Sequence, residues 1–403
     1  MPESNSKPGW TRVAFGDVVQ LSRERSSDPE DDGFDRYVGL EHVEPGDFKI
    51  RRWGDISDGT TFTRVFRAGQ VLFGKRRAYQ RKVAVADFDG VCSGDIYALE
   101  PKNARLPPDL LPFICQTDGF FEHAIGTSAG SLSPRTNWKS LAAYEFDLPP
   151  LEEQRRMARV LSGATSLAHL HHEAAAVAER VSESLLVASI RGENLGELIY
   201  DERFGRYSRL CPLTPLGDLL LATQYGLSEP STQGGEYPML RMMDLSGGLA
   251  TEDDLCSVDL SDEDFSRYRL EDGDVLFNRT NSHDLVGRTG IYKLAGDHVF
   301  ASYLVRLRTN DERLLPEYLS AFLSSPLGRR QVMRFATRGV SQTNVNASNL
   351  RNVLIPLPSI DYQRAVCGQL GQLRFARRAH QGRSSDARGL ATQVANDFLG
   401  TIT

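Results

Sequence analysis

The chain has 403 residues, of which 40% are hydrophobic and 25% are charged, and its formal net charge is −6. This composition is that of a globular protein with room for two or three domains, and no apolar run reaches the about 18–20 residues of a membrane span. The N-terminus shows no signal-peptide core and the 5 cysteines form no C-x-x-C pair, so we expect a cytoplasmic protein with reduced thiols and no zinc site.

The first 150 residues indicate a domain that contains a sheet. Short apolar runs rich in Val, Phe, Tyr and Ile are broken by Gly, Asp and Asn, as in strands joined by turns, and a helix is expected near 108–123. No acidic residue lies between Asp58 and Asp87, and the local field decides what a surface binds more than the net charge does. The basic residues of this interval are Arg64, Arg67, Lys75, Arg76, Arg77, Arg81 and Lys82.

A long helix is expected from about Glu152 to Arg191. Prolines precede its acidic first turn, where helices tend to begin. Small and aliphatic residues then recur at three- and four-residue steps, which indicates a narrow apolar stripe of the coiled-coil kind. About 40 residues at 1.5 Å each would span roughly 60 Å. Such a helix is not stable alone, so we expect it to pair with another.

The second half of the chain repeats the first in the same order, with an offset of about 200 to 209 residues. This indicates a tandem duplication of a unit of about 200 residues. The matched segments are FGDVV (15–19) with LGDLL (216–220), YVGLEHV (37–43) with YPMLRMM (237–243), AGQVLFGKR (68–76) with DGDVLFNRT (272–280), PDLLPFI (108–114) with PEYLSAF (316–322), SPRTNW (133–138) with SQTNVN (341–346), and LPPLEEQRR (148–156) with LPSIDYQRA (357–365).

The repeat predicts an α+β fold with an internal pseudo-two-fold relation. Helical segments near 316–335 and from about Asp361 to Phe398 complete the second copy. Gly368, Gly371 and the stretch HQGRSSDARG (380–389) are expected to weaken the middle of the last helix. The predicted organisation is two similar domains, each with a mixed sheet plus helices, separated by two long antiparallel helices. The boundaries are 1–150 for the first domain, 151–200 for the first helical spacer, 201–358 for the second domain and 359–403 for the second helical region.

Two polar clusters in each half are candidates for contacts with double-stranded DNA. One follows the repeated strand, and the other precedes the last strand of each domain. Lys and Arg neutralise phosphates and Arg can grip guanine, whereas Asn, Gln, Thr and Ser suit adenine edges and phosphate oxygens, although these types also make turns. Two such domains at a fixed separation would read a split sequence with an unread gap. The candidates are Lys75, Arg76, Arg77, Tyr79, Arg81, Lys82, Arg135, Thr136, Asn137, Asn278, Arg279, Thr280, Asn281, Ser282, Arg288, Gln342, Thr343 and Asn344.

A nucleotide-hydrolysing site is disfavoured. The stretch from Gly69 to Lys75 has the spacing of a P-loop, but Arg76 stands where Ser or Thr would hold Mg²⁺, and the second copy has no lysine there. A methyltransferase site is disfavoured as well, because neither a glycine-rich G-x-G turn nor an N/D-P-P-Y tetrapeptide is present.

Metal-dependent chemistry is disfavoured for similar reasons. Asp87 or Asp89 with Glu100 and Lys102 only imitates a nuclease motif, and the second copy does not repeat it. The sequence HLHH (169–172) lacks a carboxylate or cysteine at ligand spacing. We therefore expect no catalytic residue, no cofactor and no metal ion in this chain.

The same segments resemble the specificity subunits of type I restriction-modification systems. LPPLEEQRRMARVLSGA (148–164) is similar to their conserved-region motif, and residues 71–99 and 273–292 resemble segments of their target-recognition domains. The resemblance covers essentially the whole chain. It implies a non-catalytic, DNA-reading subunit in which 1–150 and 201–358 are the recognition domains.

The resemblance also implies partners. The helical regions would bind two methyltransferase subunits, and motor-nuclease subunits would complete a complex in which AdoMet, ATP and Mg²⁺ belong to the partners. LPSIDYQRAVCGQL (357–370) departs from the family motif, which puts the second partner contact in doubt. An adaptor that docks methyltransferases or mimics DNA is the alternative, and the basic runs oppose it. The partner-binding candidates are Leu151, Glu152, Gln154, Arg155, Leu161, Gln363 and Arg364.

Overall fold

A computed structural model describes residues 8–232, 234–253, 255–339 and 342–399. The described chain forms two compact units. The first contains the residues up to Ala174 together with those from His380 onward, and the second is Ala175–Ala379. The first unit is therefore discontinuous in sequence, and both long helices contribute to both units.

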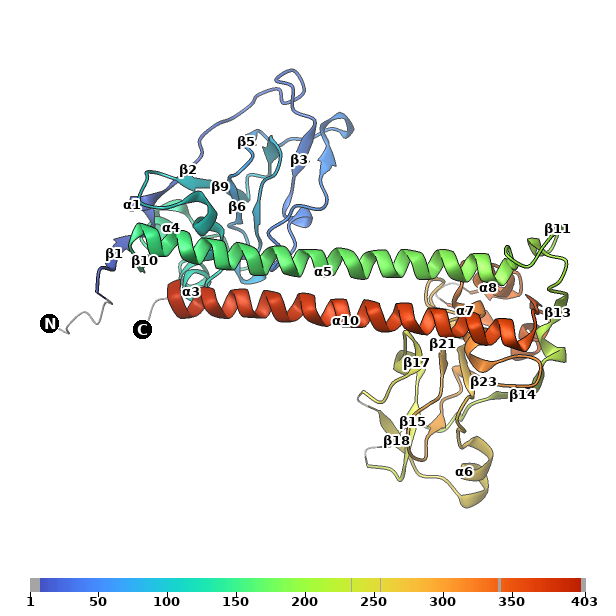
Figure 1. Ribbon diagram of the computed structural model, residues 1–403. Coiled ribbons are helices and arrows are strands. Elements are labelled where there is room, and N and C mark those ends of the chain that lie inside the picture. The colour runs from blue at the N-terminus through green and yellow to red at the C-terminus, as the bar shows by residue number, and fades with distance from the viewer. Residues whose placement is uncertain (1–7, 233, 254, 340–341, 400–403) are drawn as a thin grey trace. The chain divides into compact units, whose positions relative to one another are not determined.

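The first unit is built on two small sheets (Figure 1). One is antiparallel with the order β2-β9-β6-β7, and the other has the order β4-β3-β8-β5, with β3 parallel to β8. The strands are β2 (Val19–Leu21), β9 (Ile96–Pro101), β6 (Val71–Gly74), β7 (Val83–Val85), β4 (Gly54–Asp55), β3 (Arg36–Val38), β8 (Gly90–Cys92) and β5 (Arg64–Phe66), together with the separate pair β1 (Thr11–Ala14) and β10 (Glu145–Leu148).

Short helices cover the first sheet. The helix expected near 108–123 is divided into α2 (Leu111–Ile114) and α3 (Asp118–Gly126), because the Thr117 hydroxyl accepts a hydrogen bond from Phe120 N and starts a new helix. Aromatic rings fill the space beneath, with the centroids of Phe15 and Phe120 4.8 Å apart. The remaining helices of this layer are α1 (Phe15–Val18) and α4 (Trp138–Ala142).

The second unit repeats the strand order of the first. Its main sheet runs β14-β23-β19-β21, which corresponds to β2-β9-β6-β7, and continues into β17-β16. A parallel pair, β15 with β22, corresponds to β3 with β8. The strands are β14 (Leu220–Tyr225), β23 (Leu304–Thr309), β19 (Val275–Asn278), β21 (Thr289–Ile291), β17 (Gly248–Ala250), β16 (Leu245–Ser246), β15 (Tyr237–Leu240), β22 (Val299–Phe300), β18 (Cys256–Val258), β13 (Leu213–Pro215), β26 (Leu354–Pro356), β11 (Leu198–Asp201), β12 (Gly205–Ser208), β20 (Thr280–Asn281), β25 (Thr343–Val345) and β24 (Ala336–Arg338).

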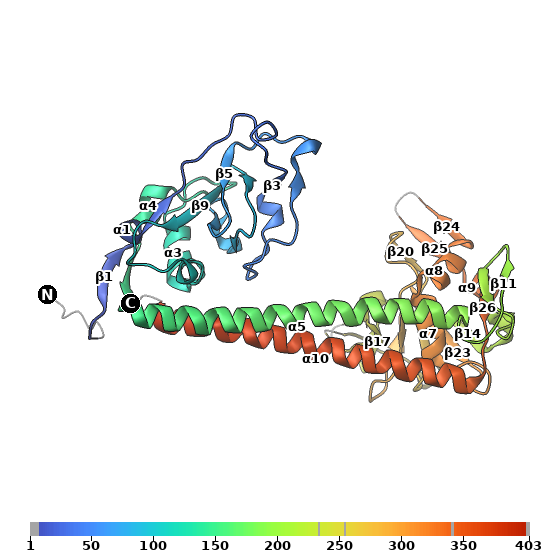
Figure 2. The ribbon, with the colours of Figure 1, turned by 45° about the horizontal axis from the view of Figure 1, so that its top comes forward.

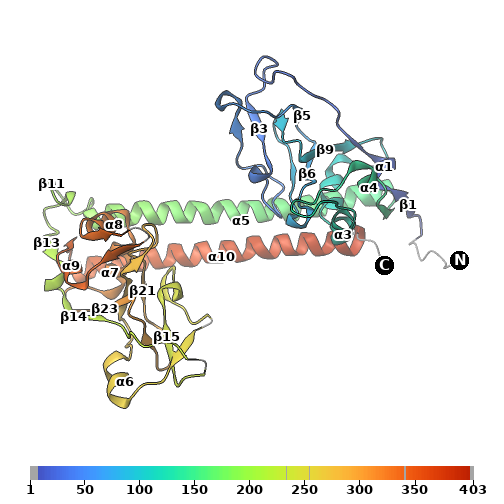
Figure 3. The same cartoon turned by 180° about the vertical axis from the view of Figure 1, so that it is seen from behind.

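In the second unit α7 packs against β21, as Figure 3 shows from behind. The helical segment expected near 316–335 is again two helices, with Ser325 as the N-cap of the second. A β-carbon at Gly328 would lie 2.0 Å from the carbonyl oxygen of Phe322, so only glycine allows this tight turn. The helices are α6 (Asp262–Tyr268), α7 (Pro316–Ser324), α8 (Pro326–Met333) and α9 (Ala347–Leu350).

The two long helices are α5 (Leu151–Arg191) and α10 (Ile360–Leu399), within two residues of the predicted ends (Figure 1). They pack antiparallel: Ser384 Oγ donates to the Ala168 carbonyl at 2.8 Å in the first unit, and Arg377 pairs with Glu179 at 2.6 Å in the second. α10 runs unbroken through Gly368 and Gly371, and the expected weakening of its middle stays a prediction about stability. No helix among the described residues is long and apolar enough to cross a membrane.

Each long helix is fastened to its own unit by a buried glutamine in its first turn. Gln154 Nε2 donates to the carbonyls of Pro149 (2.7 Å) and Arg105 (3.0 Å). Gln363 repeats the arrangement, and its Oε1 also accepts from a backbone N–H. Its bonds run to Pro358 O (3.0 Å), Arg313 O (2.9 Å) and Leu315 N (3.0 Å). The motif shared by the two copies therefore joins helix to domain.

Candidate nucleic-acid interface

The fold brings the two candidate clusters of each unit together by the same backbone pairing. In the first unit Arg76 faces Arg135 in an antiparallel bridge, and Thr136 N donates to Lys75 O at 3.0 Å. In the second unit Thr280 faces Asn344 as β20 pairs with β25. The corresponding bond runs from Val345 N to Arg279 O at 2.8 Å. Each unit therefore presents one composite surface, made from segments about 60 residues apart in sequence.

Asp95 organises the surface of the first unit. Its carboxylate accepts from Arg135 Nε at 2.7 Å and from Arg76 Nη1 at 3.3 Å. Burial disfavours the charged form of Asp95, but the bonds from Arg135 and Arg76 outweigh it, so the pKa of Asp95 is lowered. One carboxylate thus fixes two guanidinium groups whose side chains are 37% and 49% exposed.

The turn after β6 is strained at two arginines. Arg77 and Arg81 have φ of 54° and 53°, the left-handed region that non-glycine residues rarely occupy, and they flank a short 3-10 turn. The strain is held in place because Arg77 N donates to Pro134 O at 2.7 Å. This turn pushes Tyr79 outward, with 55% of its surface exposed.

The other basic residues of this turn are engaged within the unit. Lys75 Nζ lies 4.9 Å from the ring centroid of Tyr97, and burial together with nearby Arg64 lowers the pKa of Lys75. Arg81 pairs with Asp118 at 2.5 Å, and Lys82 Nζ donates to a backbone carbonyl at 2.6 Å. Their charge still contributes to the local field, but their donors are partly used.

On the surface of the second unit, amides and hydroxyls surround the guanidinium group of Arg279 (Figure 2 shows β20, β24 and β25 beside α8). The guanidinium of Arg279 lies 4.7 Å from the ring centroid of Tyr225 and donates to Asn344 Oδ1 at 3.5 Å. Asn344 Nδ2 in turn donates to Thr280 Oγ1 at 2.9 Å. Next to this network in the chain, Asn281 is half-buried and Ser282 is exposed.

The structure separates the DNA candidates by exposure. Thr136, Asn278, Thr280 and Thr343 are buried and support the surface from within. Asn137 is exposed, but its side chain caps α4 by accepting from Ser140 N at 2.9 Å. Direct contact with DNA stays a prediction for every candidate. The exposed members are Tyr79, Arg135, Asn137, Ser282, Arg288 and Gln342, and the half-buried ones are Lys75, Arg76, Arg77, Arg81, Lys82, Arg279, Asn281 and Asn344.

Sequence reasoning missed Asp95 and Tyr225. Asp95 lies just before β9, and an acidic residue directly before a strand that follows a basic run is a signal that could have suggested a charge partner. Tyr225 ends β14, about 50 residues before Arg279, and nothing in the sequence links the two.

The partner-binding candidates also divide. Leu151, Glu152 and Arg155 are exposed on the first turn of α5, with Glu152 and Arg155 paired at 2.6 Å. Arg364 is exposed on α10. The remaining three, Gln154, Leu161 and Gln363, are buried within their own units. Contact with a partner stays a prediction for all seven.

The residues of the disfavoured metal sites have other partners. Glu100 accepts from Gln20 Nε2 at 2.8 Å and from Gln70 Nε2 at 2.7 Å. His169 contacts Glu173 at 3.0 Å and Arg51 at 2.8 Å. Within the described part of the chain, no group of three or more His, Cys, Asp or Glu side chains could hold a metal ion.

Fold and site together define a tandem-domain protein whose two halves present different polar surfaces on one scaffold. Residues 8–180 and 216–372 match a family model described as the type I restriction modification DNA specificity domain. The chain belongs to this family, the specificity subunits of type I restriction-modification systems.

The chain is also similar to individual specificity subunits. The chain is 25% identical over 287 residues to the type I restriction enzyme EcoKI specificity subunit of Escherichia coli K12, covering 66% of this chain and 60% of that one. The StySPI specificity subunit of Salmonella potsdam is 25% identical over 313 residues, covering 74% and 64%. Matches thus span less than two thirds of these relatives.

Among solved structures, the S subunit of a type I restriction-modification system from M. genitalium has a TM-score of 0.61 at 12% identity, covering 100% of this chain and 99% of that one. A chain from a structure describing complex assembly and conformational transition of a type I system has a TM-score of 0.56 at 22% identity, covering 97% of each. These likenesses support the fold.

Proposed function

We propose that each domain of this chain reads one half of a two-part site in double-stranded DNA, with an unread gap between the halves. The observation that carries the proposal is the matched backbone pairing of the two surfaces. Lys75, Arg76 and Arg135 occupy the places taken in the second unit by Arg279, Thr280 and Asn344. One scaffold with two different sets of side chains suits the reading of two different half-sites.

The two surfaces favour different bases. The first offers guanidinium groups, which match phosphates and the O6 and N7 acceptors of guanine. The second offers Asn344 and Asn281, whose amides match the N6 and N7 edge of adenine. We infer that the half-site of the first unit depends more on guanine and the other more on adenine.

Partners would supply the chemistry. The exposed first turn of α5, with Leu151, Glu152 and Arg155, is a candidate surface for a methyltransferase subunit, and the corresponding surface near Arg364 of α10 would take a second one. Motor-nuclease subunits would join this assembly. AdoMet, ATP and Mg²⁺ would then act in the partners. The alternative of a DNA-mimicking adaptor is less well supported. A DNA mimic needs a negatively charged surface, whereas the arginine-rich surface of the first unit is positively charged.

The proposal is tested by mapping the adenines that the assembled complex methylates. We expect a two-part motif in which two short specified sequences flank several unspecified positions. A single continuous palindrome would contradict the proposal.

Lengthening both long helices together should change the gap. Seven residues, about two helical turns, inserted after Ala174 in α5 and after Ala379 in α10 add about 10.5 Å, or roughly three base pairs. We expect the same half-sites at a gap about three base pairs longer when the methylated motif is mapped. The same insertion in α5 alone, which breaks the pairing with α10, serves as the control. A change in the specified bases would sink the model.

Replacing Asp95 with Asn should loosen discrimination while strengthening nonspecific binding. The substitution removes the carboxylate that neutralises and orients Arg76 and Arg135, so we expect nonspecific affinity to rise roughly two- to fivefold and the ratio of specific to nonspecific affinity to fall. Fluorescence anisotropy with matched and mismatched duplexes measures both. Glu44→Gln, which removes an exposed carboxylate paired with Arg52, is the control. An unchanged ratio would mean that Asp95 does not position the reading groups.

A further inference from the structure

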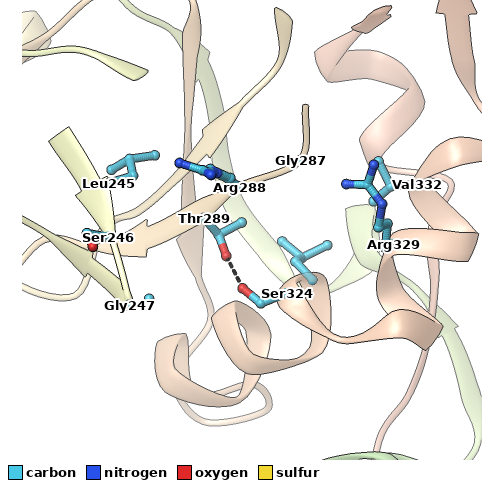
Figure 4. A pocket seen from close by; sticks show the side chains of 11 residues that line it. Leu245, Ser246, Gly247, Gly287, Arg288, Thr289, Ser324, Arg329 and Val332 are labelled. Carbon is cyan, nitrogen blue, oxygen red and sulfur yellow. Dashed lines mark hydrogen bonds between the residues drawn. The ribbon is translucent and has the colours of Figure 1, made fainter. Parts of the chain in front are cut away.

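The second unit contains a cavity of about 350 Å³ next to the candidate interface. It lies between the β16–β17 hairpin, the start of β21 and the ends of α7 and α8. Figure 4 shows Arg288 and Arg329 on different elements that line the pocket, Arg288 toward Leu245 and Arg329 beside Val332. The hydroxyls of Thr289 and Ser324 are 2.8 Å apart and joined by a hydrogen bond. This volume lies near the lower end for small-molecule sites.

The charge of this cavity is entirely positive. Of the described residues that line it, only Arg288 and Arg329 carry charge. Two further arginines of α10 stand against the hairpin: Arg378 Nη2 and Arg374 Nη1 lie 3.4 and 3.5 Å from the positions that β-carbons at Gly247 and Gly248 would occupy. Glu317 is near Arg374, but it pairs with Lys293 at 2.7 Å.

The cationic character of Arg329 is not cancelled by its contacts. Its Nη1 donates to Val286 O at 2.9 Å and its Nη2 donates to His283 O. Carbonyl oxygens accept hydrogen bonds from these donors but carry no net charge. The guanidinium of Arg329 therefore remains positive and can attract an anion.

Two successive glycines lie at the turn of the β16–β17 hairpin, next to these arginines. Gly247 and Gly248 have φ of 59° and 81°, a conformation that side chains disfavour. A larger residue at either position would be strained by this backbone conformation, although its β-carbon would only be in ordinary van der Waals contact with the guanidinium groups of α10. The two glycines therefore allow the tight turn that lies beside Arg374 and Arg378.

We propose that this pocket binds a phosphoryl group, attracted by the positive charge of Arg288 and Arg329, with hydroxyls of Ser246 and Ser324 beside it. Guanidinium groups match phosphate oxygens in charge and geometry. The phosphoryl group can come from the DNA backbone or from a free nucleotide. Arg329 holds the carbonyls of the same loop that carries Arg279 and Ser282, so an occupant bears on the reading surface.

The test uses the full-length chain and its Arg288→Gln variant, because the Arg288 side chain is exposed and its loss spares the core. Arg206→Gln, an exposed arginine on β12 of the same unit that does not line the pocket, is the matched control. Calorimetric titration with AMP and with inorganic phosphate measures free ligands. Anisotropy of a duplex bound to the complex assembled with methyltransferase subunits, from low to high salt, measures the DNA contact.

If the occupant is a free ligand, we expect saturable binding of AMP or phosphate. This binding should weaken at least tenfold in Arg288→Gln and be unchanged in Arg206→Gln. If the occupant is a phosphate of the DNA backbone, we expect no saturable binding of small anions. The salt dependence of DNA affinity should then fall in slope by about 1 in Arg288→Gln and not in Arg206→Gln. If Arg288→Gln matches Arg206→Gln in both measurements, the site is overturned. The DNA measurement rests on the proposed function and the AMP measurement does not. If the complex assembled with the unaltered chain did not bind DNA, this result would therefore count against the proposed DNA-reading function and not against the anion site.

Discussion

Replacing Gln363 with Ala should lower the free energy of unfolding of the second unit by about 2–4 kcal/mol. The side chain is fully buried and bonds to Pro358 O, Arg313 O and Leu315 N. Its removal takes this partner from three backbone groups that lie in buried or half-buried surroundings. Urea unfolding followed by circular dichroism measures the loss.

Gln154→Ala is the matched control for this prediction. Gln154 makes the two corresponding donor bonds, but among the described residues its Oε1 has no partner. We therefore expect its loss to be smaller by about 1 kcal/mol. If Gln363→Ala unfolded like the unaltered chain yet failed to assemble with methyltransferase subunits, the glutamine would be a partner contact and not a clamp.

The double substitution Arg76→Ala with Arg135→Ala should weaken DNA binding by the assembled complex roughly 10- to 100-fold and lower the salt slope by up to about 2. Each guanidinium can neutralise one phosphate or grip one guanine, and both side chains are partly exposed at the joined clusters of the first unit. Anisotropy titrations over a range of salt concentrations measure affinity and slope together.

Two companions make this result specific. Arg12→Ala with Arg52→Ala removes two exposed arginines of the same unit that pair with acids away from the clusters. Adding Asp95→Asn to the double variant removes the carboxylate left unpaired, so the remaining loss reports the arginine contacts. An affinity and slope equal to those of the Arg12 and Arg52 control would show that the joined clusters do not meet DNA.

Much of the fold was predictable because the sequence contains two copies of the same unit. Segments such as 68–76 and 272–280 matched, and the structure shows the same strand order around both. The ends of α5 and α10 were predicted closely because a long apolar period is a strong signal. α10 is continuous through its glycines, and polar caps at Thr117 and Ser325 interrupt helices that the apolar pattern alone would continue.

The site was less predictable because it depends on pairing between distant segments. The residues flanking Arg76 and those flanking Arg135 were each proposed as clusters, but their union comes from a backbone bridge across the fold. Residue type also did not distinguish an outward threonine from an inward one. Thr136 and Thr343 face the interior, and Gln154 and Gln363 are buried and bond to backbone groups of their own units.

Because the second unit interrupts the first in sequence, the two units can complete their folding only in a particular order. Its core includes Ala391, Ala395 and Leu399 of α10, and Asn396 exchanges hydrogen bonds with Asp118 at 2.7 and 2.8 Å. At about 5–20 residues per second, the ribosome needs roughly 10–40 s to make the intervening second unit. The first unit therefore keeps part of its apolar core exposed until the last segment of α10 has been translated. The second unit can complete its core earlier, because all of its residues have been translated by then.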